Sequence, residues 1–202
     1  MCGIVGYTGP NPALSKVIEG LRRLEYRGYD SAGVALATKV GAPLTVAKKA
    51  GKLANLEAVL TAEFESARGG IGHTRWATHG GPTDENAHPH LDDDGKLAVI
   101  HNGIIENYIE LRAELEKRGH KYKSETDTES VAHLLSDEMK KSGDLAAAMR
   151  AVCKELRGSF TLLAIHSDHP DRIVGARRNS PLVVGVGNGE NFLASEIGRA
   201  HV

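Results

Sequence analysis

The sequence predicts an α+β domain built in layers around two sheets. Five short strand-like runs and two helical patterns lie in the first half of the chain, three helical segments follow, and four further strand-like runs come last. Strands, then helices, then strands indicate sheets covered by separate helices, because a parallel α/β fold would alternate the two element types. With 202 residues, 41% of them hydrophobic, the chain is long enough for one substantial core or two small ones.

Glycine and proline separate the elements of the first half. Apolar residues at helical spacing, from Leu14 to Leu24, predict one amphipathic helix there. A polar segment at 78–95 is long for a simple connection, and long ordered loops are usually functional. The expected strands are 2–7, 34–37, 44–47, 71–75 and 97–101, and the expected helices are 13–25 and 53–64.

The second half carries three helical patterns and then four strand-like runs. Each helical pattern has apolar residues three and four positions apart. No internal repeat, low-complexity tract or linker interrupts them. The expected helices are 108–118, 128–141 and 144–156, and the expected strands are 160–166, 173–176, 182–186 and 192–194.

Composition excludes several classes of function. The net charge is -1, from 25 basic and 26 acidic residues, so no nucleic-acid partner and no membrane surface are expected. No apolar stretch approaches the length of a membrane span, and the first residues do not resemble a signal peptide. Two cysteines form no disulfide framework, so we expect a reducing, cytoplasmic location.

Cys2 directly follows the initiator methionine. That methionine is usually removed before a small residue, and its removal would give Cys2 a free α-amine. An α-amine has a pKa of about 7.7–8.0, so it could serve as the base for its own thiol near neutral pH. The simpler interpretation is a small buried cysteine at the start of a strand.

Six sequence motifs support the catalytic interpretation: CGIVGY, RLEYRGYDSAG, HTRWATHG, NAHPH, HNGIIEN and SETDTE. They occur together in the order of a known family. The chain resembles the class II glutamine amidotransferases, and among them the glutaminase domains of glutamine–fructose-6-phosphate aminotransferases, also called glucosamine-6-phosphate synthases. The resemblance covers the chain from Cys2 to about Ser195 and implies a four-layer αββα sandwich of the N-terminal-nucleophile hydrolase type.

The resemblance implies which residues carry the reaction. Cys2 would attack the side-chain amide of glutamine and form a γ-glutamyl thioester, while its α-amine passes the thiol proton to the departing ammonia. The Asn102 side chain and the Gly103 backbone N–H would stabilise the oxyanion. No cofactor is implied.

Recognition of glutamine requires partners for its two charges. Arg75 offers a planar fork for the carboxylate, and Asp127 offers a partner for the ammonium group. By resemblance, Thr78 and His79 add contacts, and Trp76 is linked to the gating of ammonia. The supporting residues implied by the resemblance are Arg27, Gly28, His88 and His101.

Simpler interpretations remain for several of these residues. Arg75 could form a surface ion pair. Asp127 could be only a helix N-cap, since Thr126 and Glu129 fit a capping box. Asn102 and Gly103 could form a hairpin turn.

The histidines could suggest a metal site, but their spacing matches no familiar zinc pattern, so no metal is expected and structural roles are favoured. Five of them, at positions 73, 79, 88, 90 and 101, lie in one region of the sequence. The second cysteine, Cys153, lies on a predicted helix face and is expected to be buried and inert.

The resemblance also implies partners that this sequence lacks. The family enzymes carry two sugar-isomerase domains that bind fructose 6-phosphate and receive ammonia through a channel, and the full-length enzyme is expected to be a homo-oligomer. We expect one glutaminase domain at 1–195. The tail at 196–202 departs from the family pattern, and residues 197–202 match one reading frame of a common sequencing adapter, so we expect the tail to be non-native.

Three alternatives stay open at this point. The chain could be the glutaminase domain of amidophosphoribosyltransferase or of another class II member. It could be a hydrolase of a different amide. It could also be a metal-binding or regulatory domain without catalytic activity.

Overall fold

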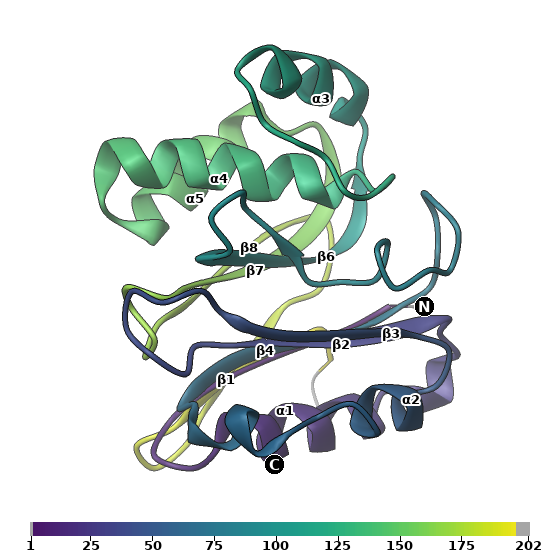
Figure 1. The fold of residues 1–202 in the computed structure, drawn as a ribbon, viewed down its shortest axis with the longest axis vertical. Helices are drawn as coiled ribbons and strands as arrows, with labels where there is room; N and C mark the ends of the chain where they lie inside the picture. Colours follow the sequence, from purple (N-terminus) through teal and green to yellow (C-terminus); the bar gives the residue numbers. More distant parts are fainter. Residues whose placement is uncertain (1, 197–202) are drawn as a thin grey trace.

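Two antiparallel sheets lie face to face, with helices on the outer side of each (Figure 1). The computed structural model describes residues 2–196, so the expected non-native tail lies outside the described residues except for Glu196. The layers follow the order helices, six-stranded sheet, four-stranded sheet, helices. The predicted four-layer αββα sandwich is therefore confirmed.

The six-stranded sheet brings the N-terminus next to a strand from the middle of the sequence. Its order is β3-β2-β4-β1-β10-β9. Gly3 pairs with Thr74, so Cys2 lies beside the end of β4, where Arg75 is. The strands are β1 (Gly3–Thr8), β2 (Ser31–Leu36), β3 (Thr45–Ala50), β4 (Gly69–Arg75), β9 (Val183–Val186) and β10 (Asn191–Ala194).

The four-stranded sheet carries the two residues that are expected to stabilise the oxyanion. Its order is β5-β6-β7-β8, and Asn102 and Gly103 lie inside β6, opposite Thr161 and Phe160 of β7. They do not form a hairpin turn, so that alternative is wrong. The strands are β5 (His90–Leu91), β6 (Leu97–Ile105), β7 (Gly158–His166) and β8 (Ile173–Arg178).

Each sheet has its own helical cover (Figure 1). The α1 and α2 helices cover the six-stranded sheet, and α4 and α5 cover the other sheet, with α3 beside them. Within residues 2–196 there is no helix that is both long and apolar enough to cross a membrane. The helices are α1 (Ala13–Arg22), α2 (Leu53–Glu57), α3 (Tyr108–Lys117), α4 (Thr128–Ser142) and α5 (Leu145–Glu155).

Three apolar clusters fill the spaces between the four layers. The cluster between the sheets contains Ile4 and Ile100, both fully buried. Ile4 lies two residues after Cys2, and Ile100 lies two residues before Asn102. Burying such a side chain contributes about 1.5–3 kcal/mol, so packing between the sheets also fixes the position of the nucleophile relative to Asn102.

Most predicted elements agree with the structure within a few residues, but the helix expected at 53–64 is wrong. The α2 helix ends at Glu57, and a separate 3₁₀ turn covers Ala62–Ser66. Thr61 has extended backbone angles, φ -118° and ψ 168°, which interrupt the helix although Leu53 and Phe64 are both buried. The two-residue strand β5 was not predicted, because it lies inside the polar segment.

Candidate active site

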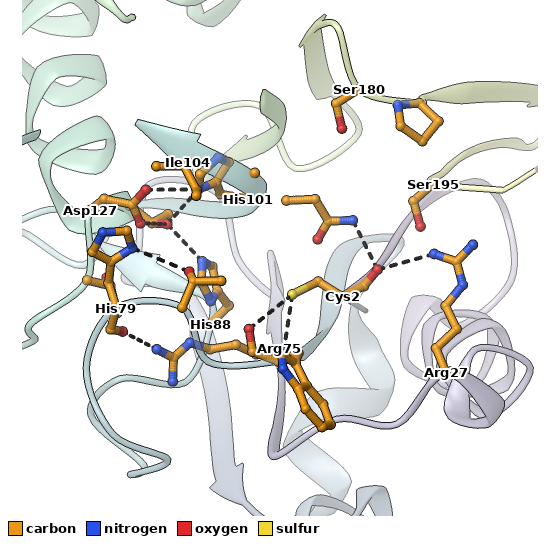
Figure 2. A pocket seen from close by; sticks show the side chains of 17 residues that line it. Cys2, Arg27, Arg75, His79, His88, His101, Ile104, Asp127, Ser180 and Ser195 are labelled. Carbon is orange, nitrogen blue, oxygen red and sulfur yellow. Dashed lines mark hydrogen bonds and ion pairs between the residues drawn. The ribbon is translucent and has the colours of Figure 1, made fainter. Parts of the chain in front are cut away.

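The predicted site residues meet in one cavity at the edge of the two sheets (Figure 2). Its volume is about 400 Å³, which is within the range of small-molecule sites. Gly28 is the one predicted site residue that does not line it. The other eleven do: Cys2, Arg27, Arg75, Trp76, Thr78, His79, His88, His101, Asn102, Gly103 and Asp127.

Cys2 lies at the centre of the view in Figure 2, partly buried, just before β1. The Trp76 backbone N–H donates to the Cys2 sulfur at 3.1 Å. Burial raises the pKa of the Cys2 thiol, and the Trp76 N–H acts in the opposite direction. At neutral pH the thiol is therefore mainly protonated, so a base is needed to form the nucleophilic thiolate.

Asn102 directs its side-chain amide at the nucleophile residue. Its Nδ2 donates to the Cys2 carbonyl oxygen at 3.2 Å, and the amide carries a second N–H. Gly103 has a φ of +125°, and a Cβ there would lie 2.1 Å from the Ser159 carbonyl oxygen. Only glycine therefore fits beside Asn102 without displacing β7.

His73 holds the Asn102 amide in this orientation. Its Nε2 lies 2.9 Å from Asn102 Oδ1, which can only accept, so Nε2 carries the proton. Full burial lowers the pKa of His73 to about 3, so the imidazole is neutral. The sequence did not reveal this role, because the partners are 29 residues apart on different sheets.

Asp127 is almost fully buried at the start of α4, with 4% of its surface exposed. Its Oδ2 accepts from the Ile105 backbone N–H at 2.8 Å, and its Oδ1 accepts from the Thr128 hydroxyl at 3.3 Å. Its carboxylate makes no cap hydrogen bond to α4. The N-cap alternative for this side chain is therefore wrong, and the carboxylate is fixed at the cavity wall.

The expected capping box is wrong as well. The Thr126 hydroxyl is paired with His90 at 2.9 Å and does not cap the helix. The Glu129 carboxylate instead accepts from the backbone N–H groups of Lys123 and Ser124, at 2.8 and 2.7 Å. Glu129 therefore fixes the loop before α4 rather than the first turn of the helix.

Two histidines support Asp127 through Thr128. His88 Nε2 and His101 Nδ1 lie 2.9 and 3.0 Å from the Thr128 hydroxyl oxygen. Since that hydroxyl donates to Asp127, both nitrogens must donate to it, which fixes the tautomer of each ring. The supporting role expected of His88 and His101 thus has a physical basis in hydrogen bonding.

Buried neutral histidines make the stability of the fold depend on pH. Burial lowers the pKa of His73 to about 3, and it lowers the pKa values of His88, His90 and His101 below their usual value. In the unfolded chain histidine has a pKa of about 6.5. Below that pH the unfolded state takes up protons that the native state does not, so stability present above pH 6.5 is lost as the pH falls toward the lowered values.

We expect each of these four histidines to lower the free energy of unfolding by up to about 1.4 kcal/mol per pH unit below 6.5. Urea unfolding at pH 7.5, 6.5 and 5.5 measures this slope before most carboxylates titrate. The variant His73→Gln should have a shallower slope than the unchanged chain. A free energy of unfolding that is the same at all three pH values would contradict the burial of these histidines in their neutral form.

Arg75 is buried, with 3% of its surface exposed, so the alternative that it forms a surface ion pair is wrong. Its guanidinium donates to the backbone carbonyls of Gly80 and Gly81, both at 3.2 Å, and to that of His79. Asp30 lies 3.9 Å from the same guanidinium. Arg75 therefore holds the loop at 79–81 against the cavity that it lines.

Trp76 and Arg27 both contact Cys2. The Trp76 side chain is 55% exposed at the cavity mouth. Gly28 has a φ of +70°, and a Cβ there would be 3.4 Å from the Trp76 ring. Gly28 therefore packs next to the Trp76 ring and does not itself line the cavity. Arg27 donates to the Cys2 carbonyl at 3.5 Å and pairs with Glu196.

The cavity has further walls that the sequence did not indicate. Ser180 and Pro181 come from the segment between β8 and β9, and Ser195 directly follows β10. Ser195 accepts from the Ile4 backbone N–H at 3.2 Å, which ties the end of the domain to the strand that carries Cys2. Ser180, Pro181 and Ser195 lie outside the six motifs, whereas Ile104, Thr126 and Thr128 lie within two of them. The further wall residues are Ile104, Thr126, Thr128, Ser180, Pro181 and Ser195.

Two ring nitrogens of the NAHPH motif are held by hydroxyl groups. His88 Nε2 is paired with the Thr128 hydroxyl, and His90 Nε2 is paired with the Thr126 hydroxyl.

Cys153 on α5 is half-buried against an apolar cluster, although the sequence analysis expected it to be buried. Burial raises the pKa of its thiol, which favours the unreactive form.

Comparisons with known proteins agree with this geometry. A family described as glutamine amidotransferase domain matches residues 73–200. The glutamine–fructose-6-phosphate aminotransferase (isomerizing) of Streptomyces coelicolor is 65% identical over 98% of this chain and 32% of that protein. The enzyme of the same name from Thermus thermophilus is 57% identical over 98% of this chain and 32% of its own length.

A solved structure has the same fold at lower identity. The glutamine phosphoribosylpyrophosphate amidotransferase from B. subtilis, complexed with ADP and GMP, matches with a TM-score of 0.80 and 28% identity, over 98% of this chain and 42% of that one. The chain spans about a third of the length of the curated relatives that it matches. On the family match and on these relatives together, the chain belongs to the glutamine amidotransferase domain family.

Proposed function

We propose that this chain hydrolyses L-glutamine to glutamate and ammonia, with Cys2 as an N-terminal nucleophile after removal of Met1. The observation that carries the proposal is the position of Cys2 in a cavity that the Asn102 amide, bonded to the Cys2 carbonyl oxygen, and the buried Asp127 carboxylate also line. Membership of the family supports glutamine as the substrate.

The reaction needs a proton acceptor for the Cys2 thiol. Removal of Met1 would free the Cys2 backbone nitrogen as an amine within the same residue, and this amine takes the thiol proton. The sulfur then bonds to the glutamine side-chain carbon, and the carbonyl becomes an oxyanion. The amine returns the proton to the leaving nitrogen, which departs as ammonia, and water hydrolyses the thioester to glutamate.

Asn102 and Gly103 are proposed to bind the oxyanion. The second N–H of the Asn102 amide is available to it, and the Gly103 backbone N–H can approach closely because Gly103 has no side chain. His73 is proposed to position Asn102 through the bond to its Oδ1. Because these donors are fixed before substrate arrives, they need no rearrangement during the reaction.

The two charges of the amino acid end are proposed to meet Arg75 and Asp127. Both side chains are buried at the cavity wall, where a charge is weakly screened and a matching ligand group is strongly favoured. Thr78 and His79 line the same cavity and are proposed to add contacts. Trp76 at the mouth is proposed to control the release of ammonia.

The variant Asp127→Asn should raise the KM for glutamine about 10–100-fold, because a hydrogen bond to a charged group contributes about 1.5–3 kcal/mol. The free energy of unfolding should fall by at most about 1–3 kcal/mol, since the asparagine oxygen can still accept from the Ile105 N–H while the bond from the Thr128 hydroxyl is lost. Steady-state kinetics and urea unfolding measure the two effects. Asp144→Asn is the matched control, because Asp144 caps α5 through Ala147 and lies outside the cavity, so its KM should not change.

In the longer protein, the ammonia is proposed to convert fructose 6-phosphate to glucosamine 6-phosphate. The names of the curated relatives, and the two thirds of their length that this chain does not span, support this proposal. Two sugar-isomerase domains and a homo-oligomeric assembly would belong to that longer protein. A cytoplasmic location is proposed because both cysteines are free and the reaction needs a reduced thiol.

The direct test is a paired assay of glutamate and ammonia formed from glutamine by the 202-residue chain. The two products should appear in equal amounts, and asparagine should be a much poorer substrate. Equal rates with unrelated carboxamides would favour a hydrolase of another amide. Absence of both products, with Met1 confirmed as removed, would contradict the proposed function.

A further inference from the structure

A second cluster of polar side chains lies away from the catalytic cavity, where α4, the loop after α3 and the turn between β5 and β6 meet. It consists of Asp93, His120 and His133, with Asp137 behind His120. One ligand atom from each of the first three residues lies within 4.8 Å of the other two. None of them lines the catalytic cavity.

His133 is the buried member of this cluster, and its ring nitrogens lack hydrogen-bond partners among the described residues. Its side chain is 1% exposed. Its Nδ1 lies 3.6 Å from Asp93 Oδ2, too far for a hydrogen bond. Because buried polar atoms are normally paired, an unpaired imidazole facing a carboxylate indicates a missing partner between them.

His120 has the arrangement that metal-binding histidines usually have. Its Nδ1 forms a hydrogen bond of 2.6 Å with Asp93 Oδ2, and a bound ion would take the place of the proton between these two atoms. Its Nε2 is paired with Asp137 Oδ1 at 3.2 Å. A carboxylate on the far nitrogen fixes the ring and raises its basicity as a ligand. The Asp137 carboxylate is itself paired with Arg118 at 3.3 Å, so it is held in place.

We propose that Asp93, His120 and His133 bind a divalent transition-metal ion of the Zn²⁺ type, with water as the fourth ligand. Two imidazoles and one carboxylate are a known ligand set for Zn²⁺. Tetrahedral ligands at about 2.0–2.2 Å from the metal lie roughly 3.3 Å apart. The observed 3.6 and 2.6 Å separations reach that value with a small movement of Asp93, whose side chain is 39% exposed.

The ion would join three segments that are distant in the sequence. Asp93 lies in the turn between β5 and β6, His120 in the loop after α3, and His133 on α4. Because the three ligands come from separate segments, no short sequence pattern marks this site. The bound ion would stabilise the loop between α3 and α4, and the site is independent of the glutaminase proposal.

The test is a Zn²⁺ titration against a chromophoric chelator, with the untagged 202-residue chain in a Cys2→Ser background. That background removes the catalytic thiol, which could itself bind Zn²⁺. One Zn²⁺ should bind per chain, and it should raise the melting temperature, while Mg²⁺, which prefers oxygen ligands, should do neither.

Four variants locate the site. Asp93→Asn and His133→Gln should each weaken Zn²⁺ binding at least about tenfold. Asp94→Asn and His169→Gln are the matched controls and should bind as the parent does, because Asp94 is the exposed neighbour of Asp93 and His169 lies between β7 and β8. Asp93 is exposed enough for its variant to remain folded. No saturable binding, or equal binding by Asp93→Asn and Asp94→Asn, would overturn the proposal.

Discussion

Replacing Cys2 by alanine should abolish glutamine hydrolysis, with a fall in kcat of about 10⁴-fold or more, since removal of a catalytic nucleophile has effects of this size. The sulfur is the atom that bonds to substrate, and no other thiol lines the cavity within the described residues. Glutamine binding should persist, because Arg75 and Asp127 are unchanged. Product assays give kcat, and calorimetry on the variant gives the affinity for glutamine.

Cys153→Ala is the matched control for this variant. Cys153 is half-buried on α5 and does not line the cavity, so its removal should leave kcat unchanged. A Cys2→Ala chain that still releases glutamate at more than about a hundredth of the parent rate would contradict the role of Cys2 as the nucleophile. Loss of a single oxyanion donor already costs about 10²–10³-fold, and loss of the nucleophile should cost more.

Replacing Asn102 by alanine should lower kcat about 10²–10³-fold and change the KM for glutamine little. The amide N–H is proposed to act on the oxyanion, which exists only after the sulfur has attacked, so its loss affects the transition state more than the bound substrate. Steady-state kinetics separates the two parameters. An equal rise in KM with unchanged kcat would instead place Asn102 in ground-state binding.

His73 provides an internal check on Asn102. His73→Leu removes the donor to Asn102 Oδ1 and should lower kcat in the same direction, whereas His73→Gln, which keeps an N–H donor, should restore part of it. Because His73 acts through Asn102, the double variant Asn102→Ala/His73→Leu should be no slower than Asn102→Ala alone. Fully additive losses would mean that His73 acts by another route.

Local pattern predicted the elements that form by local interactions. The helices α4 and α5 were predicted to within two residues, since their apolar spacing and flanking residues are both local signals. The helix α2 was overestimated, because Leu53 and Phe64 are buried on separate turns divided by extended Thr61. The sheet order β3-β2-β4-β1-β10-β9 depends on pairing between distant segments and was not predictable from spacing.

The candidate site also combines features with local sequence signals and features that depend on contacts between distant segments. The residue types that carry the chemistry, such as Cys2 and Asp127, were predicted from motifs. Their hydrogen-bond partners were not: the Asn102–His73 bond joins two sheets, and Arg75 holds the carbonyls of a loop whose path no local pattern defines. Contacts of this kind arise only when the layers pack.

The most direct test of a working N-terminal nucleophile in a glutamine-shaped cavity is the intact mass of the purified chain before and after treatment with 6-diazo-5-oxonorleucine. This electrophile has the shape of glutamine and is captured by an attacking thiolate. We predict a mass lacking Met1 and a single adduct that maps to Cys2. Retention of Met1 without an adduct, or an adduct at Cys153 instead, would contradict the proposed mechanism.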